Sequence, residues 1–98
     1  MNMQAMLQQA QKMQKEITKK KEELSKKEFV GKSQLVDVKV NGDRKVLAVD
    51  IHADSLDKDD IEMLQDMLSI AINDALTQVE NENEKILGSY GSQFGGLF

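Results

Sequence analysis

Apolar residues recur at helical spacing through the first quarter of the chain. Intervals of three, four and seven residues separate the members of this seam, which are Met3, Met6, Ala10, Met13, Ile17 and Leu24. The residues between them are Gln, Lys and Glu, which favour helix, and neither Gly nor Pro interrupts them. The pattern predicts one long helix from Asn2 to about Glu28 with a heptad seam. A rod of roughly 40 Å with so narrow an apolar stripe is expected to project outward and to pack against a partner helix.

Between Phe29 and His52, apolar residues alternate with polar ones, as in strands with one buried face. Asn41-Gly42 marks a turn, but a two-residue hairpin there would place valines opposite charged residues. A four-residue loop, Asn41 to Arg44, keeps the apolar sets on one face. It pairs Val40 with Lys45, Val38 with Leu47 and Val36 with Val49. With Phe29-Val30 as a further short strand, we predict a three-stranded antiparallel meander.

A second helix is predicted to begin near Asp57, an N-cap residue followed by acidic side chains that suit the positive end of the helix dipole. Its main apolar stripe is Ile61, Leu64, Leu68, Ile72, Ala75, Val79 and Ile86, and Met63, Met67 and Ile70 widen it. One small sheet and one thin rod cannot cover this much apolar surface, which indicates a subunit interface. From Gly88 onward the chain is rich in glycine. We expect a single domain over residues 1–87 and a disordered tail over residues 88–98.

The order helix, strands, helix predicts a small α+β fold with a long helix, a three-stranded antiparallel sheet and a second long helix. The edges and the bare face of so small a sheet would be covered by dimerisation, so we expect a homodimer. No apolar run approaches the ~20 residues of a membrane span, and the N-terminus is polar. An intracellular protein without a membrane anchor is therefore expected.

Charge is divided between the two halves of the chain. Residues 1–49 carry eleven Lys and Arg against six Asp and Glu, whereas residues 50–98 carry two Lys against eleven acidic residues. This asymmetry is typical either of a basic binding surface on an acidic body or of a basic helix lying against an acidic one. Lysines suit neutralisation of DNA phosphates without base reading, and one arginine with no pair of stacking aromatics gives no indication of sequence-specific readout. The candidate DNA-binding residues are Lys12, Lys15, Lys19, Lys20, Lys26, Lys27, Arg44 and Lys45. The first three share one helical face beside the seam.

Catalysis and metal binding have little support in the sequence. The absence of cysteine excludes a disulfide scaffold and a thiolate nucleophile, and His52, the one histidine, is interpreted as a partly exposed strand end. The acidic run from Asp54 to Glu62 lacks the spacing of a calcium loop and is explained by helix capping. Gly31 and Gly42 are interpreted as turn or bulge glycines. We expect no enzymatic activity, cofactor, metal or small-molecule substrate.

Four segments of the chain share motifs with a known family. They are Gln-Ala-Gln-Lys-Met-Gln at 9–14, Leu-Val-Asp-Val-Lys-Val-Asn-Gly at 35–42, Val-Leu-Ala-Val-Asp-Ile at 46–51 with Leu56, Glu62-Met63-Leu64 and Asp66, and Asn73-Asp74-Ala75. In order and spacing, over about residues 5–85, they resemble the YbaB/EbfC family of bacterial nucleoid-associated proteins. His52-Ala53 stands where that family usually has Asp-Pro, and its glycine-rich stretch between the first two strands is reduced here to residues 31–34.

The resemblance implies a three-stranded sheet between two long helices, dimerised into a tweezer-like body. It also implies DNA binding, with roles in nucleoid organisation and gene regulation in the bacterial cytoplasm. It supplies no residue-level DNA site, so the candidate lysines rest on charge alone. An alternative is a prefoldin-like protein-interaction or co-chaperone module without nucleic acid, to which exposed Met3, Met6 and Met13 would be suited.

Overall fold

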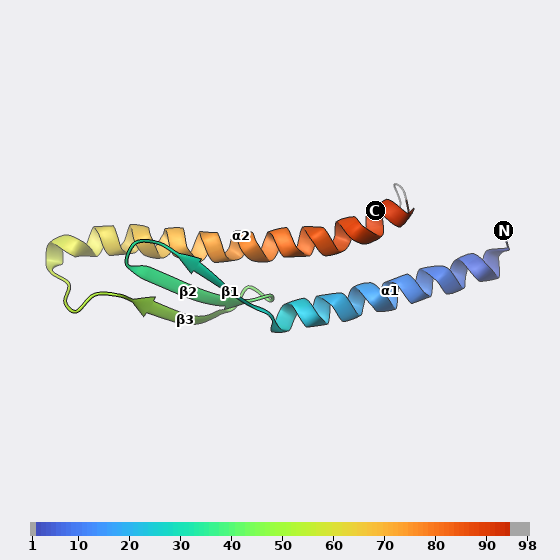
Figure 1. Ribbon diagram of the computed structural model, residues 1–98, viewed down its shortest axis with the longest axis horizontal. Helices are drawn as coiled ribbons and strands as arrows, with labels where there is room; N and C mark the ends of the chain where they lie inside the picture. The colour runs from blue at the N-terminus through green and yellow to red at the C-terminus, as the bar shows by residue number, and fades with distance from the viewer. Residues whose placement is uncertain (1, 95–98) are drawn as a thin grey trace.

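The computed structural model describes residues 2–94, with side chains up to residue 89. The elements follow one another as α1 (Met3–Lys26), β1 (Glu28–Lys32), β2 (Val36–Asn41), β3 (Val46–Ile51), the one-turn 3₁₀ helix η1 (Lys58–Asp60) and α2 (Ile61–Phe94). This order, with an antiparallel sheet β1-β2-β3, confirms the predicted α+β fold. In Figure 1 the sheet lies against the first half of α2 and α1 runs back along the second half, within an elongated shape of 70 × 22 × 13 Å. Among the described residues, no helix is both long enough and apolar enough to cross a bilayer.

Polar residues cap the starts of both long helices. The Asn2 side chain accepts a hydrogen bond from the Ala5 N–H at 2.7 Å. Ahead of α2, the Asp57 N–H donates to Asp60 Oδ2 at 3.0 Å, and the acidic first turn suits the positive end of the helix dipole. The predicted start of the second helical segment near Asp57 is therefore confirmed.

The end of α2 lies further along the chain than the sequence indicated. The helix was expected to stop before Gly88, at the domain end at residue 87, whereas it continues through this glycine to Phe94. A helix tolerates such a segment because a glycine costs it only about 1 kcal/mol and no proline removes a backbone donor. Residues 95–98 of the predicted tail lie outside the described residues.

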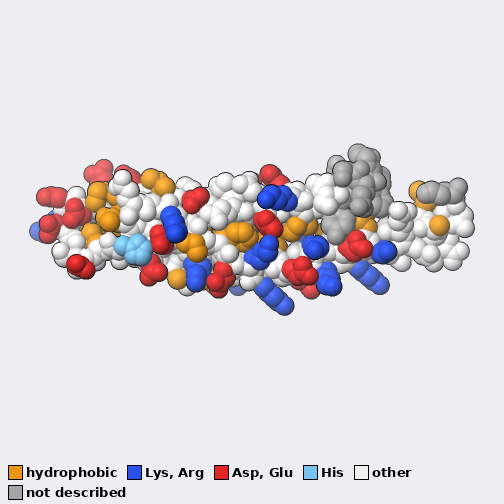
Figure 2. Space-filling model, in the orientation of Figure 1, with side chains coloured by type: hydrophobic (Ala, Val, Ile, Leu, Met, Phe, Trp, Pro, Cys, Tyr) orange, Lys and Arg blue, Asp and Glu red, His pale blue; other side chains and the backbone are white. Residues whose placement is uncertain are grey.

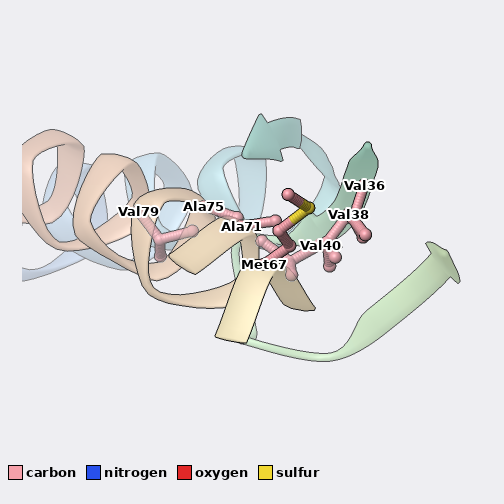
Figure 3. Packing of buried hydrophobic residues seen from close by; sticks show 7 residues of the cluster. All are labelled: Val36, Val38, Val40, Met67, Ala71, Ala75 and Val79. Atoms are coloured by element: carbon pink, nitrogen blue, oxygen red, sulfur yellow. The ribbon is translucent and has the colours of Figure 1, made fainter. Parts of the chain in front are cut away.

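The core lies between β2 and the first half of α2. Figure 3 shows the three valines of β2, at positions 36, 38 and 40, pointing toward α2, where they are fully buried. On α2 the buried residues recur every four positions, at Met67, Ala71, Ala75 and Val79. Each fully buried valine contributes on the order of 1.5–3 kcal/mol. Of the predicted apolar stripes, Leu64, Leu68 and Ile72 are half-buried, and Ile61, Met63 and Ile70 are exposed.

Two glycines allow backbones to meet without a side chain between them. A Cβ at Gly31 would collide with the Ala71 carbonyl oxygen and would lie 2.5 Å from the Ala75 nitrogen. Gly31 is therefore a contact between β1 and α2, and its interpretation as a turn or bulge glycine was wrong. Gly42 does lie in the hairpin turn, where a Cβ would collide with the Leu24 carbonyl oxygen at the end of α1.

The predicted register between the second and third strands was wrong. The observed partners are Val36 and Ile51, Val38 and Val49, and Val40 and Val46. Leu47 is an extra residue between the partners of Lys39 and Val40, so β3 contains a β-bulge. The connection covers residues 42–45, one position later than predicted, and Asn41 Oδ1 accepts the N–H groups of Asp43 and Lys45 at 2.9 and 3.1 Å. The bulge places Val46, Val49 and Ile51 on the same face as the valines of β2.

That apolar face of β3 is uncovered. Helix α2 contacts β1 and β2 but, within the part of the chain that the structure describes, not β3. Val46, Val49 and Ile51 are consequently 50, 46 and 44% exposed. The whole chain has an accessible surface of 7462 Å², whereas a compact monomer of this mass exposes about 5,600 Å². The surplus apolar surface expected from the sequence is therefore present, and it lies on β3 as well as on α2.

Candidate nucleic-acid interface

Helix α1 turns four lysines away from the body of the protein. Its buried residues are Met13 and Leu24, at 6 and 5% exposure. At about 100° per residue, four exposed lysines lie on the opposite side of the helix. We call these four the outer lysine row: Lys12, Lys15, Lys19 and Lys26. Figure 2 shows basic side chains standing out along the lower edge of the molecule, over α1. The first three were expected beside the seam, but at about 100° per residue they lie across the helix from it.

Lys20 and Lys27 lie closer to α2 than the outer row does. Lys27 Nζ is 2.9 Å from Glu82 Oε1 on α2, and Lys20 is 3.9 Å from Glu23 within α1. The hydrogen bond and the charge of Lys27, with a smaller contribution from Lys85, hold the pKa of Glu82 below its ordinary value of 4.5. Two of the predicted DNA-binding lysines are therefore already paired with carboxylates in the free protein.

A hollow of about 270 Å³ between α1 and α2 brings Lys20 and Lys27 together with Lys85. Lys85 was not among the candidates, because it stands in the acidic half of the sequence, and only the antiparallel return of α2 places it here. Glu23 and Glu82 line the same hollow. Its mixed charge makes it a weaker site for phosphate than the outer lysine row.

The tip of the β2–β3 hairpin rests on the end of α1. The Gly42 N–H donates to the Lys27 carbonyl oxygen at 3.1 Å. Arg44, held at φ 64° in the left-handed region, donates its N–H to the Asn41 carbonyl oxygen at 3.0 Å and lines a hollow of about 210 Å³ with Lys21. The structure thus brings Arg44 next to α1, and the basic neighbour that it meets, Lys21, was absent from the candidate set. Lys45 follows it, exposed.

The division of charge along the sequence is also a division in space. Helix α1 contains six lysines and three glutamates, a net charge of +3. The opposite end of the molecule, around η1 and the start of α2, is acidic in Figure 2; its residues are Asp54, Asp57, Asp59, Asp60 and Glu62. Among the ion pairs of the described residues, only Lys27–Glu82 links the α1 end to α2. The structure therefore combines a basic α1 end with an ion pair that joins this end to α2.

His52 and the acidic side chains of the described residues form no metal site, because no group of three or more of them is placed to hold a metal ion. His52 is exposed, as expected for a strand end, and its Nε2 lies 3.0 Å from Asp37 Oδ2. Its backbone N–H donates to the Leu35 carbonyl oxygen at 2.7 Å. These contacts fix the end of β3 against β2.

Comparison with known proteins gives one family and many close relatives. Residues 1–94 match the family described as the YbaB/EbfC DNA-binding family. A nucleoid-associated protein of Streptococcus agalactiae serotype III is 45% identical over 95 residues, which cover 95% of this chain and 96% of the relative. One of Enterococcus faecalis is 47% identical over 98 residues, covering 98% and 94%, and one of Lactococcus lactis subsp. lactis is 48% identical over 92 residues, covering 92% and 93%.

Proposed function

This chain belongs to the YbaB/EbfC DNA-binding family, and from that premise we propose that it is a homodimer that binds duplex DNA mainly through phosphate contacts. The bacterial nucleoid, in the cytoplasm, is its proposed place of action, and its proposed roles are nucleoid organisation and gene regulation. The nucleoid-associated relatives support this proposal. DNA and a second copy of the chain are the proposed partners, and no catalytic step is part of the function.

The observation that carries the DNA-binding proposal is the outer lysine row. From Lys12 to Lys26 the row extends for roughly 21 Å along α1, at 1.5 Å per residue. Duplex DNA carries one negative charge for about every 1.7 Å of its axis, so such a row faces several phosphates at once. Lysine heads on flexible stems neutralise phosphates without reading bases, which predicts binding with little sequence preference. In a dimer the row occurs twice.

The uncovered face of β3 supports the homodimer. Val46, Val49 and Ile51 expose an apolar surface that a second copy would bury through the same residues, as a twofold interface requires. The elongated single chain exposes 7462 Å², against about 5,600 Å² for a compact monomer of its mass, so it leaves surface that a partner could cover.

Replacement of Val49 by Asp is expected to split the dimer. Val49 is 46% exposed in the single chain, so the carboxylate stays in water in the monomer but would be buried without a partner in the dimer. Light scattering should give twice 11.0 kDa for the parent protein and 11.0 kDa for the variant. Val30→Asp is the matched control, because Val30 is exposed on the other face of the sheet, opposite Lys39, and this variant should stay dimeric. A parent mass of 11.0 kDa would contradict the homodimer.

Replacement of Lys12, Lys15 and Lys19 together by Gln is expected to weaken DNA binding roughly ten- to a hundredfold. Glutamine keeps the helix propensity of lysine, so the circular dichroism spectrum should not change. The measurement is a titration of random-sequence duplex at several salt concentrations. Because log affinity falls by about 0.9 per log unit of salt for each phosphate contact, the variant should also show a shallower salt slope.

Three lysines outside α1 provide the control for this experiment. Replacement of Lys32, Lys39 and Lys58 by Gln changes the net charge by the same amount, and these side chains belong to β1, β2 and η1. This control should bind DNA nearly as tightly as the parent. If the α1 variant kept the parent's affinity and slope, the site would move to Lys26, Lys27 and Arg44, where the hairpin meets α1.

The co-chaperone alternative has partial support from exposure. Met3 and Met6 are 86 and 54% exposed near the free end of α1, but Met13, which that alternative also needs, is 6% exposed. A parent protein that bound no duplex at any salt concentration would favour this alternative.

A further inference from the structure

The two edges of the sheet differ in how their backbone groups are satisfied. Strand β1 pairs with β2 on one side only, so its other side carries N–H and C=O groups that the sheet leaves unpaired. Two side chains of α2 reach this edge. Asp74 Oδ2 accepts the Lys32 N–H at 3.0 Å, and Gln78 Nε2 donates to the Val30 carbonyl oxygen at 2.9 Å. One donor and one acceptor of the β1 edge are thus saturated by side chains.

The spacing of these residues matches the strand that they cap. Asp74 and Gln78 are four positions apart, about 6 Å along the helix axis, and Val30 and Lys32 are two positions apart, about 6.8 Å along the strand. Gly31 stands between the capped residues and lets the two backbones approach, because a Cβ there would collide with the Ala71 carbonyl oxygen. The glycine and the two polar side chains therefore act together on one edge.

Strand β3 has no such cover. No side chain of the described residues hydrogen-bonds to its outer edge, and α2 does not contact it. A sheet with two open edges can pair with further copies at both edges, which gives an open-ended polymer of subunits. A sheet with one open edge closes after a single pairing between copies.

We propose that Asp74 and Gln78 determine the specificity of self-association by closing the β1 edge, so that copies of this protein meet through the β3 side alone. The inference rests on the proposed homodimer, and it explains why further copies do not add at the β1 edge. It gives a role to two polar residues of mid-α2 that DNA binding does not require.

The test is the double variant Asp74→Ala/Gln78→Ala, measured by light scattering over a range of concentrations and by amide hydrogen exchange. The Lys32 amide loses its acceptor, so its exchange should become about tenfold faster, the effect of one net hydrogen bond. The mass should rise above that of the parent with concentration, as the opened edges pair. Asn73→Ala/Thr77→Ala is the matched control, because these neighbours on α2 are exposed and have the same spacing. The control should keep the parent's mass.

Conservative variants separate capping from a general loss of stability. Asp74→Asn keeps a carbonyl acceptor for the Lys32 N–H and should behave as the parent does. If the double variant lost its helical circular dichroism spectrum, the single variant Gln78→Ala would be measured by light scattering in its place. Growth of its mass with concentration would support the proposal, and the parent's mass would overturn it. A folded double variant with the parent's mass at every concentration would also overturn it. A parent mass of 11.0 kDa would instead contradict the homodimer, and growth of the double variant above that mass would still support closure of the β1 edge.

Discussion

Replacement of Val38 by Asp is expected to abolish folding. Val38 is fully buried at the centre of β2, between two other fully buried valines. The variant loses about 1.5–3 kcal/mol of apolar burial and places an unpaired carboxylate where no water or cation reaches it, which costs several kcal/mol more. A loss of about 5 kcal/mol removes most of the stability of a domain of this size. Circular dichroism during urea titration should show no cooperative transition.

The cross-strand partner of Val38 provides the control for this prediction. Val49 lies directly opposite Val38 on β3, so both positions share the same face of the sheet. Because Val49 is exposed in the single chain, Val49→Asp should keep the helical spectrum while the dimer splits. Equal effects of the two substitutions on folding would contradict the core described here.

Replacement of Gly31 by Ala is expected to lower the thermal midpoint by on the order of 15 °C. The added methyl would collide with the Ala71 carbonyl oxygen and lie 2.5 Å from the Ala75 nitrogen. Backbone atoms cannot rotate away as a flexible side chain can. Helix α2 must therefore shift away from β1, which weakens the packing between the two elements. We expect a loss of about 3 kcal/mol, and about 4–8 °C per kcal/mol applies to a domain of this length. Scanning calorimetry at fixed protein concentration measures the change.

Gly88 provides the opposite case on the same helix as the residues that Gly31 meets. Apart from its own helical backbone and chain neighbours, no described atom lies within 4 Å of a Cβ placed there, and the position is in the interior of α2. Gly88→Ala should therefore raise the stability by about 0.5–1 kcal/mol, because alanine loses less backbone entropy in a helix. A Gly31→Ala variant as stable as the parent would show that β1 and α2 are not in close contact.

Most of the fold could be predicted from the sequence because its signals are local. The seam of α1, the alternation in β2 and the cap at Asp57 each follow from residues within one or two turns of each other. The register of β3 could not be predicted, because Val46, Leu47 and Val49 are all apolar and the pattern does not show which of them forms the bulge. The predicted register was two residues off at Val38, where Leu47 took the place of Val49, and one residue off at Val40, where Lys45 took the place of Val46.

The candidate site was predicted in composition but not in arrangement. The excess of lysines in the first half of the chain indicated a basic surface, and all eight candidate residues are exposed. Which of these residues lie near a carboxylate or another lysine depends on where α2 returns along α1. This return places Glu82 against Lys27 and Lys85 near Lys20. Arg44 meets Lys21 only because the hairpin tip rests on the end of α1.

The sequence by itself determined the order of elements, the buried face of β2 and the net charge of α1, because periodicity, caps and charge counts are properties of neighbouring residues. Only the tertiary structure decided that Gly31 is a contact, that Asp74 and Gln78 cap β1, and that the apolar face of β3 is uncovered. These features join residues forty or more positions apart, or they depend on which strands α2 reaches. No local sequence pattern predicts these contacts, because they arise only when the helix packs at a particular distance from the sheet.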